Sequence, residues 1–171
     1  LLLIKIIEQF DLPAMTEVDR VHVLAEAAKI AYHMRDTYVA DPDVEHVPVD
    51  WLLSDSQIKT FASMIDMTKA QHFGPSDFPT HAHTIYLAAV DKDGTAISLI
   101  NSIFDDFGSG FSTPEYGVLF QSRGRAFRID EGHPNRIMGG KRPLHTIIPG
   151  MITKGQDLIG PFGVMGGQYQ A

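Results

Sequence analysis

Apolar residues recur at three- and four-residue spacing in the first part of the chain, as in an α-helix with one buried face. This pattern predicts two helices, one that begins after the N-cap Thr16 and one that begins at Ser54 or Asp55. A linker at residues 39–43 separates them, because the residue before Pro42 is pushed out of the helical region. The apolar positions expected to be buried are Val21, Leu24, Ala28, Ala31 and Met34 in the first helix and Ile58, Phe61, Met64 and Ile65 in the second.

The second part of the chain has the two-residue period and the turn residues of β-strands. A loop rich in Gly, Pro and His fills residues 71–83, and strand-like runs follow at 84–90 and 95–100. The residues Asp-Lys-Asp-Gly at 91–94 join these runs and predict a β-hairpin. Helices first and strands afterwards indicate the α+β class. Further strands are predicted at 118–121, 144–148 and 163–165.

The composition is that of a folded protein without nucleic-acid or thiol chemistry. The 171 residues suffice for one ordinary domain with a substantial core. Because 14 Lys and Arg stand against 21 Asp and Glu, the net charge is −7, and no nucleic-acid partner is expected. The chain has no Cys, which excludes disulfides, thiolate metal ligands and a Cys nucleophile.

The two ends of the sequence are unusual. The run Leu1–Ile7 is apolar and has no initiator Met, but it is too short to cross a bilayer, so no membrane partner is expected. No basic segment precedes it and no small-residue cleavage site follows it, so it is not a signal peptide. The sequence does not determine the cellular compartment of the protein, and a cytoplasmic location is slightly favoured. Since the sequence stops just after Gly166 and Gly167, we expect a fragment of a longer protein.

Isolated motifs give little evidence of a site. His72, His81 and His83 lie close together in sequence, but no carboxylate or Cys completes a ligand pattern, so a solvated loop is favoured and no metal is expected. The Gly-Ser-Gly at 108–110 lacks the Lys and the helix of a phosphate-binding loop. Asp105 and Asp106, as neighbours at a strand end, point apart.

The order of several motifs along the chain is more informative. The His-rich loop runs into Thr84, and three motifs follow: Phe-Gly-Ser-Gly at 107–110, Gly-Gly-Lys-Arg-Pro-Leu-His-Thr-Ile-Ile-Pro at 139–149 and Val-Met-Gly-Gly at 164–167. This order resembles the gamma-glutamyltransferase family of N-terminal nucleophile hydrolases along the whole chain. Together with an upstream Arg-Gly at 123–124, the 139–149 motif looks closer to the branch that includes oxamate amidohydrolase and acylases.

The resemblance implies a self-processing enzyme. Members of the family cut their own chain immediately before a threonine, so the scissile bond is expected between His83 and Thr84. A Thr hydroxyl is a weak nucleophile that needs an adjacent base. Cleavage creates that base, since a free α-amino group has a pKa of about 7.7–8.0. The implied fold is a four-layer αββα sandwich, with residues 1–83 in the large-subunit region and residues 84–171 in the small-subunit region.

Further catalytic positions follow from the same resemblance. The family places a second hydroxyl on the paired strand, where it contacts the nucleophile, and that position falls on Ser102. A Gly-Gly pair, here Gly166 and Gly167, supplies backbone N–H groups to the oxyanion. Glycine suits this role because the backbone can approach the substrate without a Cβ atom.

The substrate-recognition positions differ from those of the enzymes that handle glutathione. Their Asp for the substrate amino group falls on Ala126, and their Asn for the glutamyl end falls on Phe104. Their two serines for the α-carboxylate fall on His145 and Thr146. A buried ammonium without its carboxylate is costly, so glutamyl recognition is not favoured. Two arginines that could pair with a substrate carboxylate instead are Arg123 and Arg125.

The resulting expectation is an amide hydrolase that needs no cofactor. Thr84 attacks the amide carbonyl of a small, carboxylate-bearing amide, an acyl-enzyme forms, and water releases the acid. The expected partners are the substrate, the remaining chain of the same enzyme and a second copy in a homo-oligomer. Two alternatives stay open: a glutathione hydrolase or gamma-glutamyl transpeptidase, and an inactive truncated scaffold or binding module.

Overall fold

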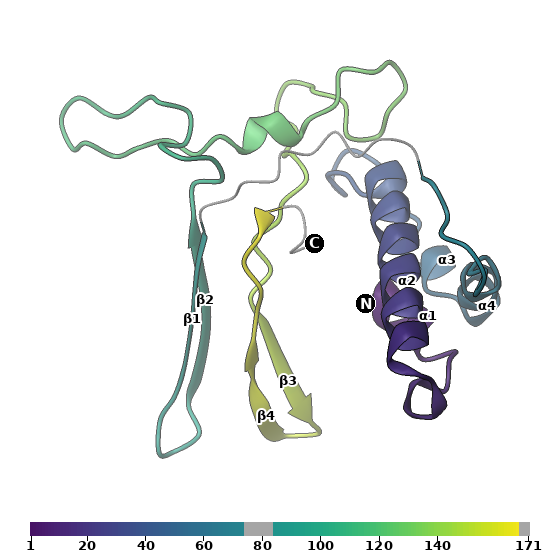
Figure 1. Cartoon of the computed structure of the whole chain (residues 1–171). Coiled ribbons are helices and arrows are strands. Elements are labelled where there is room, and N and C mark those ends of the chain that lie inside the picture. The colour runs from purple at the N-terminus through teal and green to yellow at the C-terminus, as the bar shows by residue number, and fades with distance from the viewer. Residues whose placement is uncertain (74–83, 168–171) are drawn as a thin grey trace. The chain divides into compact units, whose positions relative to one another are not determined.

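The computed structural model describes residues 1–73 and 84–167, which divide into two compact units (Figure 1). The first unit holds residues 1–73 together with 130–136, and the second holds 84–129 and 137–167. The first unit is helical, and the second contains antiparallel strands. The α+β prediction is therefore confirmed.

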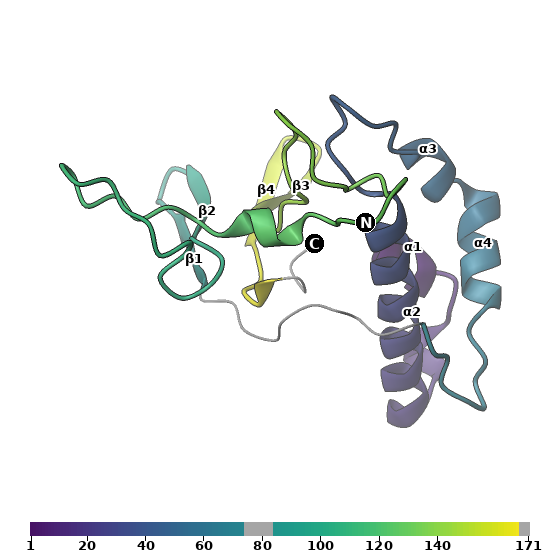
Figure 2. The same cartoon turned by 90° about the horizontal axis from the view of Figure 1, so that it is seen from above.

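The first unit consists of helices that follow one another along the sequence. Both views place α3 and α4 on the same side of α2 (Figure 1, Figure 2). No helix within the described ranges is long and apolar enough to cross a membrane. The helices are α1 (Leu2–Ile7), the 3-10 helix η1 (Leu12–Ala14), α2 (Glu17–Tyr38), α3 (Val49–Leu52) and α4 (Asp55–Ser63).

Side-chain caps fix where the two predicted helices begin. The Thr16 hydroxyl accepts a hydrogen bond from the Asp19 N–H at 3.2 Å and donates one to the Asp19 carboxylate at 2.7 Å. At the start of α4, the Ser54 hydroxyl accepts from the Gln57 N–H at 3.4 Å. Each cap satisfies an N–H group that has no partner within the helix. Thr16 and Ser54 are thus confirmed as N-caps.

The buried face of α2 differs from the predicted one. The buried apolar residues are Val23, Ala27 and Ile30, whereas Val21 and Leu24 are 61% and 42% exposed. The reason is that apolar residues surround most of α2, so the contacts with α1 and α4 decide which face is buried. In α4 the prediction holds for three of four positions, since its C-cap Met64 is exposed. The core of the unit consists of Ile6, Ala27, Ile30, Leu52, Ile58, Phe61 and Ile65.

The second unit contains two separate hairpins. In the first, β1 (Thr84–Val90) pairs antiparallel with β2 (Ala96–Ser102). The Asp91 carboxylate accepts hydrogen bonds from the N–H groups of Asp93 and Thr95, and Gly94 adopts a positive φ of 84°. These contacts form the turn that the sequence predicts. The second hairpin pairs β3 (Gly150–Lys154) with β4 (Asp157–Phe162), and a short 3-10 helix, η2 (Arg123–Ala126), lies between the hairpins in sequence.

The three further strands predicted from the sequence are wrong. Residues 118–121 contribute only an isolated bridge between Ser112 and Leu119, and residues 144–148 and 163–165 are irregular. Within 144–148, the Ile147 N–H donates to the His145 ring rather than to a neighbouring strand. In this irregular segment only Leu144 and Thr146 are buried, and periodicity alone does not distinguish that spacing from a strand.

Candidate functional site

The hairpin of β1 and β2 brings two hydroxyl groups together at its open end. Thr84 and Ser102 are paired in register, so their side chains lie on the same face of the hairpin. The Thr84 Oγ1 donates a hydrogen bond to the Ser102 Oγ at 3.1 Å. Both side chains are partly exposed. The contact that the family resemblance implies between these residues is therefore present in the structure.

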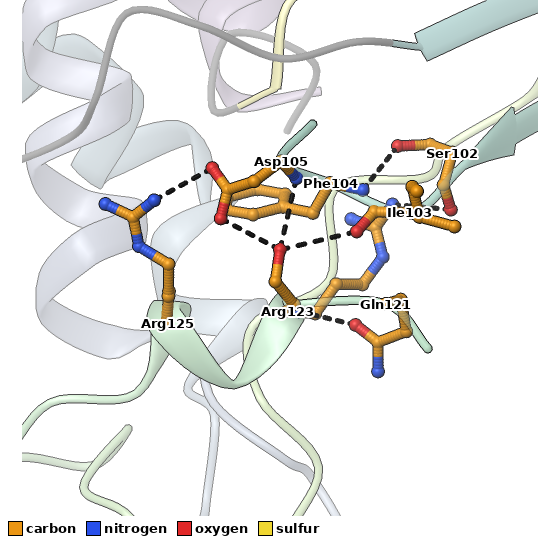
Figure 3. Close-up of polar contacts among 8 residues, drawn as sticks. Ser102, Ile103, Phe104, Asp105, Gln121, Arg123 and Arg125 are labelled. Carbon is orange, nitrogen blue, oxygen red and sulfur yellow. Dashed lines mark hydrogen bonds and ion pairs between the residues drawn. The ribbon is translucent and has the colours of Figure 1, made fainter. Parts of the chain in front are cut away.

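A strained backbone holds the Ser102 hydroxyl in place. The N–H of Phe104 donates to the Ser102 Oγ at 3.1 Å, at a backbone φ of 78° (Figure 3). A left-handed φ is uncommon for a bulky residue and costs free energy, so other contacts must stabilise it. The Phe104 ring supplies some of them, because it is buried and its centroid lies 5.4 Å from the Arg123 guanidinium carbon.

Arg123 occupies the centre of this cluster. Its side chain is only 3% exposed. The Nη1 donates to the Thr146 hydroxyl at 2.9 Å. The Nη2 donates to the Ser102 carbonyl oxygen at 3.5 Å (Figure 3). Burial lowers the pKa of Arg123, yet a guanidinium stays charged in a protein. The buried positive charge of Arg123 is thus linked to the Thr84 hydroxyl through a single residue, Ser102.

The start of η2 is fastened to the end of β2 by a second polar network. The Ser122 hydroxyl donates to the Asp105 carboxylate at 2.8 Å and accepts from the Asp105 N–H at 3.1 Å. The exposed Arg125 pairs with the other oxygen of the same carboxylate at 2.9 Å (Figure 3). This network positions the backbone around Arg123. The sequence does not predict the contact between Asp105 and Ser122, because it spans 17 residues and no local pattern marks it.

The two residues after Pro143-Leu144 differ in their surroundings. Thr146 is 1% exposed and accepts the Arg123 hydrogen bond, whereas His145 is exposed. The pKa of His145 lies below its ordinary value, first because partial burial disfavours the charged ring and second because of the Arg123 charge. Its Nδ1 accepts from the Ile147 N–H at 3.2 Å, which requires an unprotonated nitrogen. His145 is thereby a neutral group near pH 7.

The Gly-Gly pair follows a residue that contacts β1, the strand that begins at Thr84. The N–H of Tyr86, two residues after Thr84, donates to the Met165 sulfur at 3.2 Å. Gly166 and Gly167 come next, with φ angles of 148° and 58° that glycine adopts without strain. Gly166 and Gly167 thus directly follow Met165, whose sulfur is hydrogen-bonded to β1.

The remaining sequence candidates do not form sites among the described residues. His81 and His83, and with them the expected scissile bond, lie outside the described ranges. Within those ranges, no group of three His, Cys, Asp or Glu residues is arranged to hold a metal ion. Gly108 serves a close backbone approach instead of phosphate binding, since a Cβ atom there would come within 2.1 Å of the Phe120 carbonyl oxygen.

Comparison with known proteins gives one consistent family. The family model described as Gamma-glutamyltranspeptidase matches residues 1–171. The chain is 34% identical over 154 residues to the oxamate amidohydrolase proenzyme of Klebsiella pneumoniae, covering 90% of this chain and 29% of that protein. It is also 34% identical over 173 residues to the glutathione hydrolase-like YwrD proenzyme of Bacillus subtilis, covering 99% of this chain and 32% of that protein.

A solved structure agrees with these relatives. The cephalosporin acylase of Bacillus halodurans is similar with a TM-score of 0.85 and 39% sequence identity. The match covers 99% of this chain and 31% of the acylase chain. The chain thus spans about a third of the length of the relatives it matches.

Proposed function

The chain belongs to the gamma-glutamyltranspeptidase family, and on this premise we propose that it carries the nucleophile of a self-processing amide hydrolase. The observation that carries the proposal is the hydrogen bond from Thr84 to Ser102 across the open end of the β1–β2 hairpin. Two relatives are named as proenzymes, which supports self-processing. Cleavage before Thr84 would divide the chain into residues 1–83 and 84–171.

The proposed processing step makes the catalytic base. The Thr84 Oγ1 attacks the carbonyl carbon of residue 83, the C–N bond breaks, and the acyl group moves to the oxygen as an ester. Water then hydrolyses the ester, which leaves Thr84 with a free α-amino group and a free hydroxyl. Near neutral pH this amine accepts the hydroxyl proton, which a Thr side chain does not give up unaided.

The proposed hydrolysis repeats the same chemistry on an external amide. The Thr84 oxygen forms a bond to the substrate carbonyl carbon, and the leaving amine departs with the proton taken up by the α-amino group. Water then cleaves the acyl-enzyme ester and releases the acid. Ser102, held by the Phe104 N–H, orients the Thr84 hydroxyl. The N–H groups of Gly166 and Gly167 stabilise the tetrahedral oxyanion, a contribution of about 3–4 kcal/mol per donor.

The proposed substrate is a small amide that carries a carboxylate. Arg123 and Thr146 would bind it, with Phe104 and His145 alongside and Arg125 at the exposed rim. The relative named oxamate amidohydrolase supports this class. A glutathione hydrolase is the second candidate, favoured by the relative named glutathione hydrolase-like. Against it stands Ala126, which supplies no carboxylate for a glutamyl ammonium.

The test of the nucleophile is a variant series at Thr84 in the full-length protein. We expect the wild type to convert near neutral pH into two fragments, the smaller of which has the N-terminal sequence Thr-Ile-Tyr-Leu-Ala. Thr84→Ala should abolish both this cleavage and amide hydrolysis, and Thr84→Ser should retain both because it keeps the hydroxyl. The matched control is Thr153→Ala, which removes an exposed strand hydroxyl in β3.

Two results would contradict the proposal. One is an active Thr84→Ala variant, which would place the nucleophile elsewhere. The other is a wild-type protein that stays intact and turns over no amide, which would favour the inactive scaffold or binding module. Turnover of a γ-glutamyl anilide above that of oxamate and a glutaryl amide would instead favour the glutathione hydrolase.

A further inference from the structure

We infer that Glu26 and Lys29 are positioning residues for self-processing: from α2 they hold the backbone of Gln71 and so fix the chain that leads to the expected scissile bond. The inference rests on the proposed function, since it assigns a task in the cleavage before Thr84. It adds no chemical step and gives the two residues no part in the hydrolysis of an external amide. Processing and turnover should therefore respond differently to substitutions at Glu26.

The first argument is that one charged pair binds both backbone groups of a single residue. The Gln71 N–H donates to the Glu26 Oε2 at 3.1 Å, and the Lys29 Nζ donates to the Gln71 carbonyl oxygen at 2.9 Å. Glu26 and Lys29 also form an ion pair with each other. Because hydrogen bonds are directional, two of them on one peptide backbone fix its orientation as well as its position.

The second argument is the charge of this pair. Glu26 is 1% exposed, whereas the Lys29 side chain is 36% exposed. Burial raises the pKa of Glu26, but hydrogen bonds from Lys29 and Gln71 outweigh this effect and leave the pKa below its ordinary value. Glu26 is therefore charged at neutral pH. Since a buried ion pair adds little stability compared with apolar residues of similar volume, the geometry that it imposes on Gln71 is the better explanation for its presence.

The third argument is that the same face of α2 holds the same segment at two further points. The His22 Nε2 donates to the Asp66 carbonyl oxygen at 2.9 Å, and the ring centroids of His33 and Phe73 lie 5.0 Å apart. These two histidines flank the ion pair at helical spacing, four residues away in each direction. Residues 66–73 lie in turns and irregular backbone, whose polar groups need partners from elsewhere in the protein. This face of α2 supplies such partners.

An anchored chain favours cleavage through orientation. Attack requires the Thr84 hydroxyl to lie close to the carbonyl carbon of His83 in one particular orientation. Each backbone bond that rotates freely before this carbonyl lowers the fraction of molecules in that orientation. The anchor at Gln71 limits this freedom on one side, and the β1–β2 hairpin limits it on the other. Loss of the anchor should therefore slow cleavage while the hydroxyl groups of the hairpin stay in place.

The test measures the rate at which the full-length chain converts into its two fragments near neutral pH. Glu26→Gln keeps the size of the side chain but removes its charge, and we expect about tenfold slower cleavage, the value of one charge-assisted hydrogen bond. Lys29→Arg keeps a cation that can reach the Gln71 carbonyl oxygen and should retain near wild-type cleavage. Lys69→Gln is the matched control, since it removes an exposed ion pair with Asp66 in the same segment.

A second readout separates positioning from general support of the fold. Once cleaved, Glu26→Gln should have the kcat/KM of the processed wild type. The substrate for this comparison is whichever of oxamate, a glutaryl amide and a γ-glutamyl anilide the wild type turns over fastest. Equal losses in cleavage rate and in kcat/KM would overturn the inference, as would an unchanged cleavage rate in Glu26→Gln.

A pair of variants at Gln71 leaves α2 unaltered and decides the question if Glu26→Gln fails to fold. Gln71→Pro removes the N–H that Glu26 accepts, whereas Gln71→Ala keeps both backbone groups. We expect Gln71→Pro to cleave slowly and Gln71→Ala to cleave at the wild-type rate, and equal rates in the two variants would refute the inference. In each of these results the wild type still cleaves, whereas a wild type that does not cleave removes the proposed function and this inference with it.

Discussion

The first unit of the chain buries more apolar side chains than the second, although each unit also buries charged ones such as Glu26 and Arg123. In the first unit the fully buried residues are mostly aliphatic, such as Ile6, Ala27 and Ile30. In the second unit the most buried positions include Arg123 and Thr146. The strand residues of the second unit are widely exposed by contrast, with relative exposures between 48% and 68% for Ile85, Leu87, Ile97 and Leu99.

This difference separates two contributions to a folded structure, apolar burial and hydrogen bonding. Apolar burial is non-directional and contributes roughly 25 cal/mol per Å², so the first unit gains stability from the total area it buries. A hydrogen bond contributes only about 0.5–1.5 kcal/mol net but demands a particular geometry. In the second unit, the hydrogen bonds around Arg123, Thr146 and Ser102 form a polar cluster that fixes the local geometry. Several candidate site residues lie in this polar cluster. The two units are therefore expected to respond differently to the loss of methyl groups and of polar partners.

The largest effect is expected in the helical core. Ile30→Ala removes a fully buried side chain between α2 and its neighbours. The free energy of unfolding of the first unit should fall by about 2–5 kcal/mol, because apolar burial is lost and a cavity remains. Denaturant unfolding followed by helix circular dichroism measures this change.

The matched substitution in the second unit is Ile97→Ala on the exposed face of β2, where the side chain is 48% exposed. Its effect on the free energy of unfolding should stay below about 1 kcal/mol, since little apolar area is lost. Equal losses from the two substitutions would show that the contrast in apolar burial between the units has no consequence for stability.

An intermediate effect is expected at the polar cluster. Thr146→Val keeps the shape of the side chain but removes the hydroxyl that accepts the Arg123 hydrogen bond. The buried donor is left without this partner, which costs about 1–3 kcal/mol. Amide hydrogen exchange should speed up around η2 and the end of β2, while the helices of the first unit stay unchanged.

Thr146→Ser is the control for this substitution, because it keeps the hydroxyl and should restore slow exchange. Unchanged exchange around η2 in Thr146→Val would mean that the hydrogen bond to Arg123 does not stabilise this part of the second unit. Faster exchange across the first unit as well would mean that the two units do not respond separately.

Local sequence signals predicted the elements that local chemistry determines. Thr16 and Ser54 cap their helices through contacts three residues away, and such contacts are legible in the sequence. The turn around Asp91 and Gly94 is legible in the sequence, and the pairing of Thr84 with Ser102, which the family resemblance implies, is present in the hairpin. The hairpin therefore followed from local sequence signals, and the contact between its two hydroxyls followed from the resemblance.

Contacts between segments that are far apart in the sequence cannot be predicted from local sequence patterns. Which face of α2 is buried depends on α1 and α4, so the sequence pattern wrongly predicts the exposed Val21 as a core position. The hairpin of β3 and β4 was missed, because the apolar run at 144–148 drew the strand assignment to the wrong segment. The link of Asp105 to Ser122 and the contact of Arg123 with Thr146 join residues far apart in sequence. Only the folded chain brings them together.

The smallest predicted effect, and the most specific to the second unit, is the titration of His145. Burial and the nearby Arg123 charge both disfavour the protonated ring, so the pKa of His145 should lie below the ordinary value of 6.5. Because the pKa is lowered by folding, the stabilising contribution of the neutral ring is present above pH 6.5. It is lost as the pH falls through the lowered pKa of the folded protein.

NMR titration of the ring signals, assigned with His145→Gln, measures this pKa directly. Arg123→Gln removes the second cause and should raise the pKa of His145 towards its ordinary value without reaching it, since burial remains. Arg125→Gln should leave the pKa of His145 unchanged, because the Arg125 charge is exposed and already paired with Asp105. A larger response to Arg125→Gln than to Arg123→Gln would show that the positive charge next to His145 belongs to Arg125. The polar cluster of the second unit would then be organised around its exposed arginine instead of its buried one.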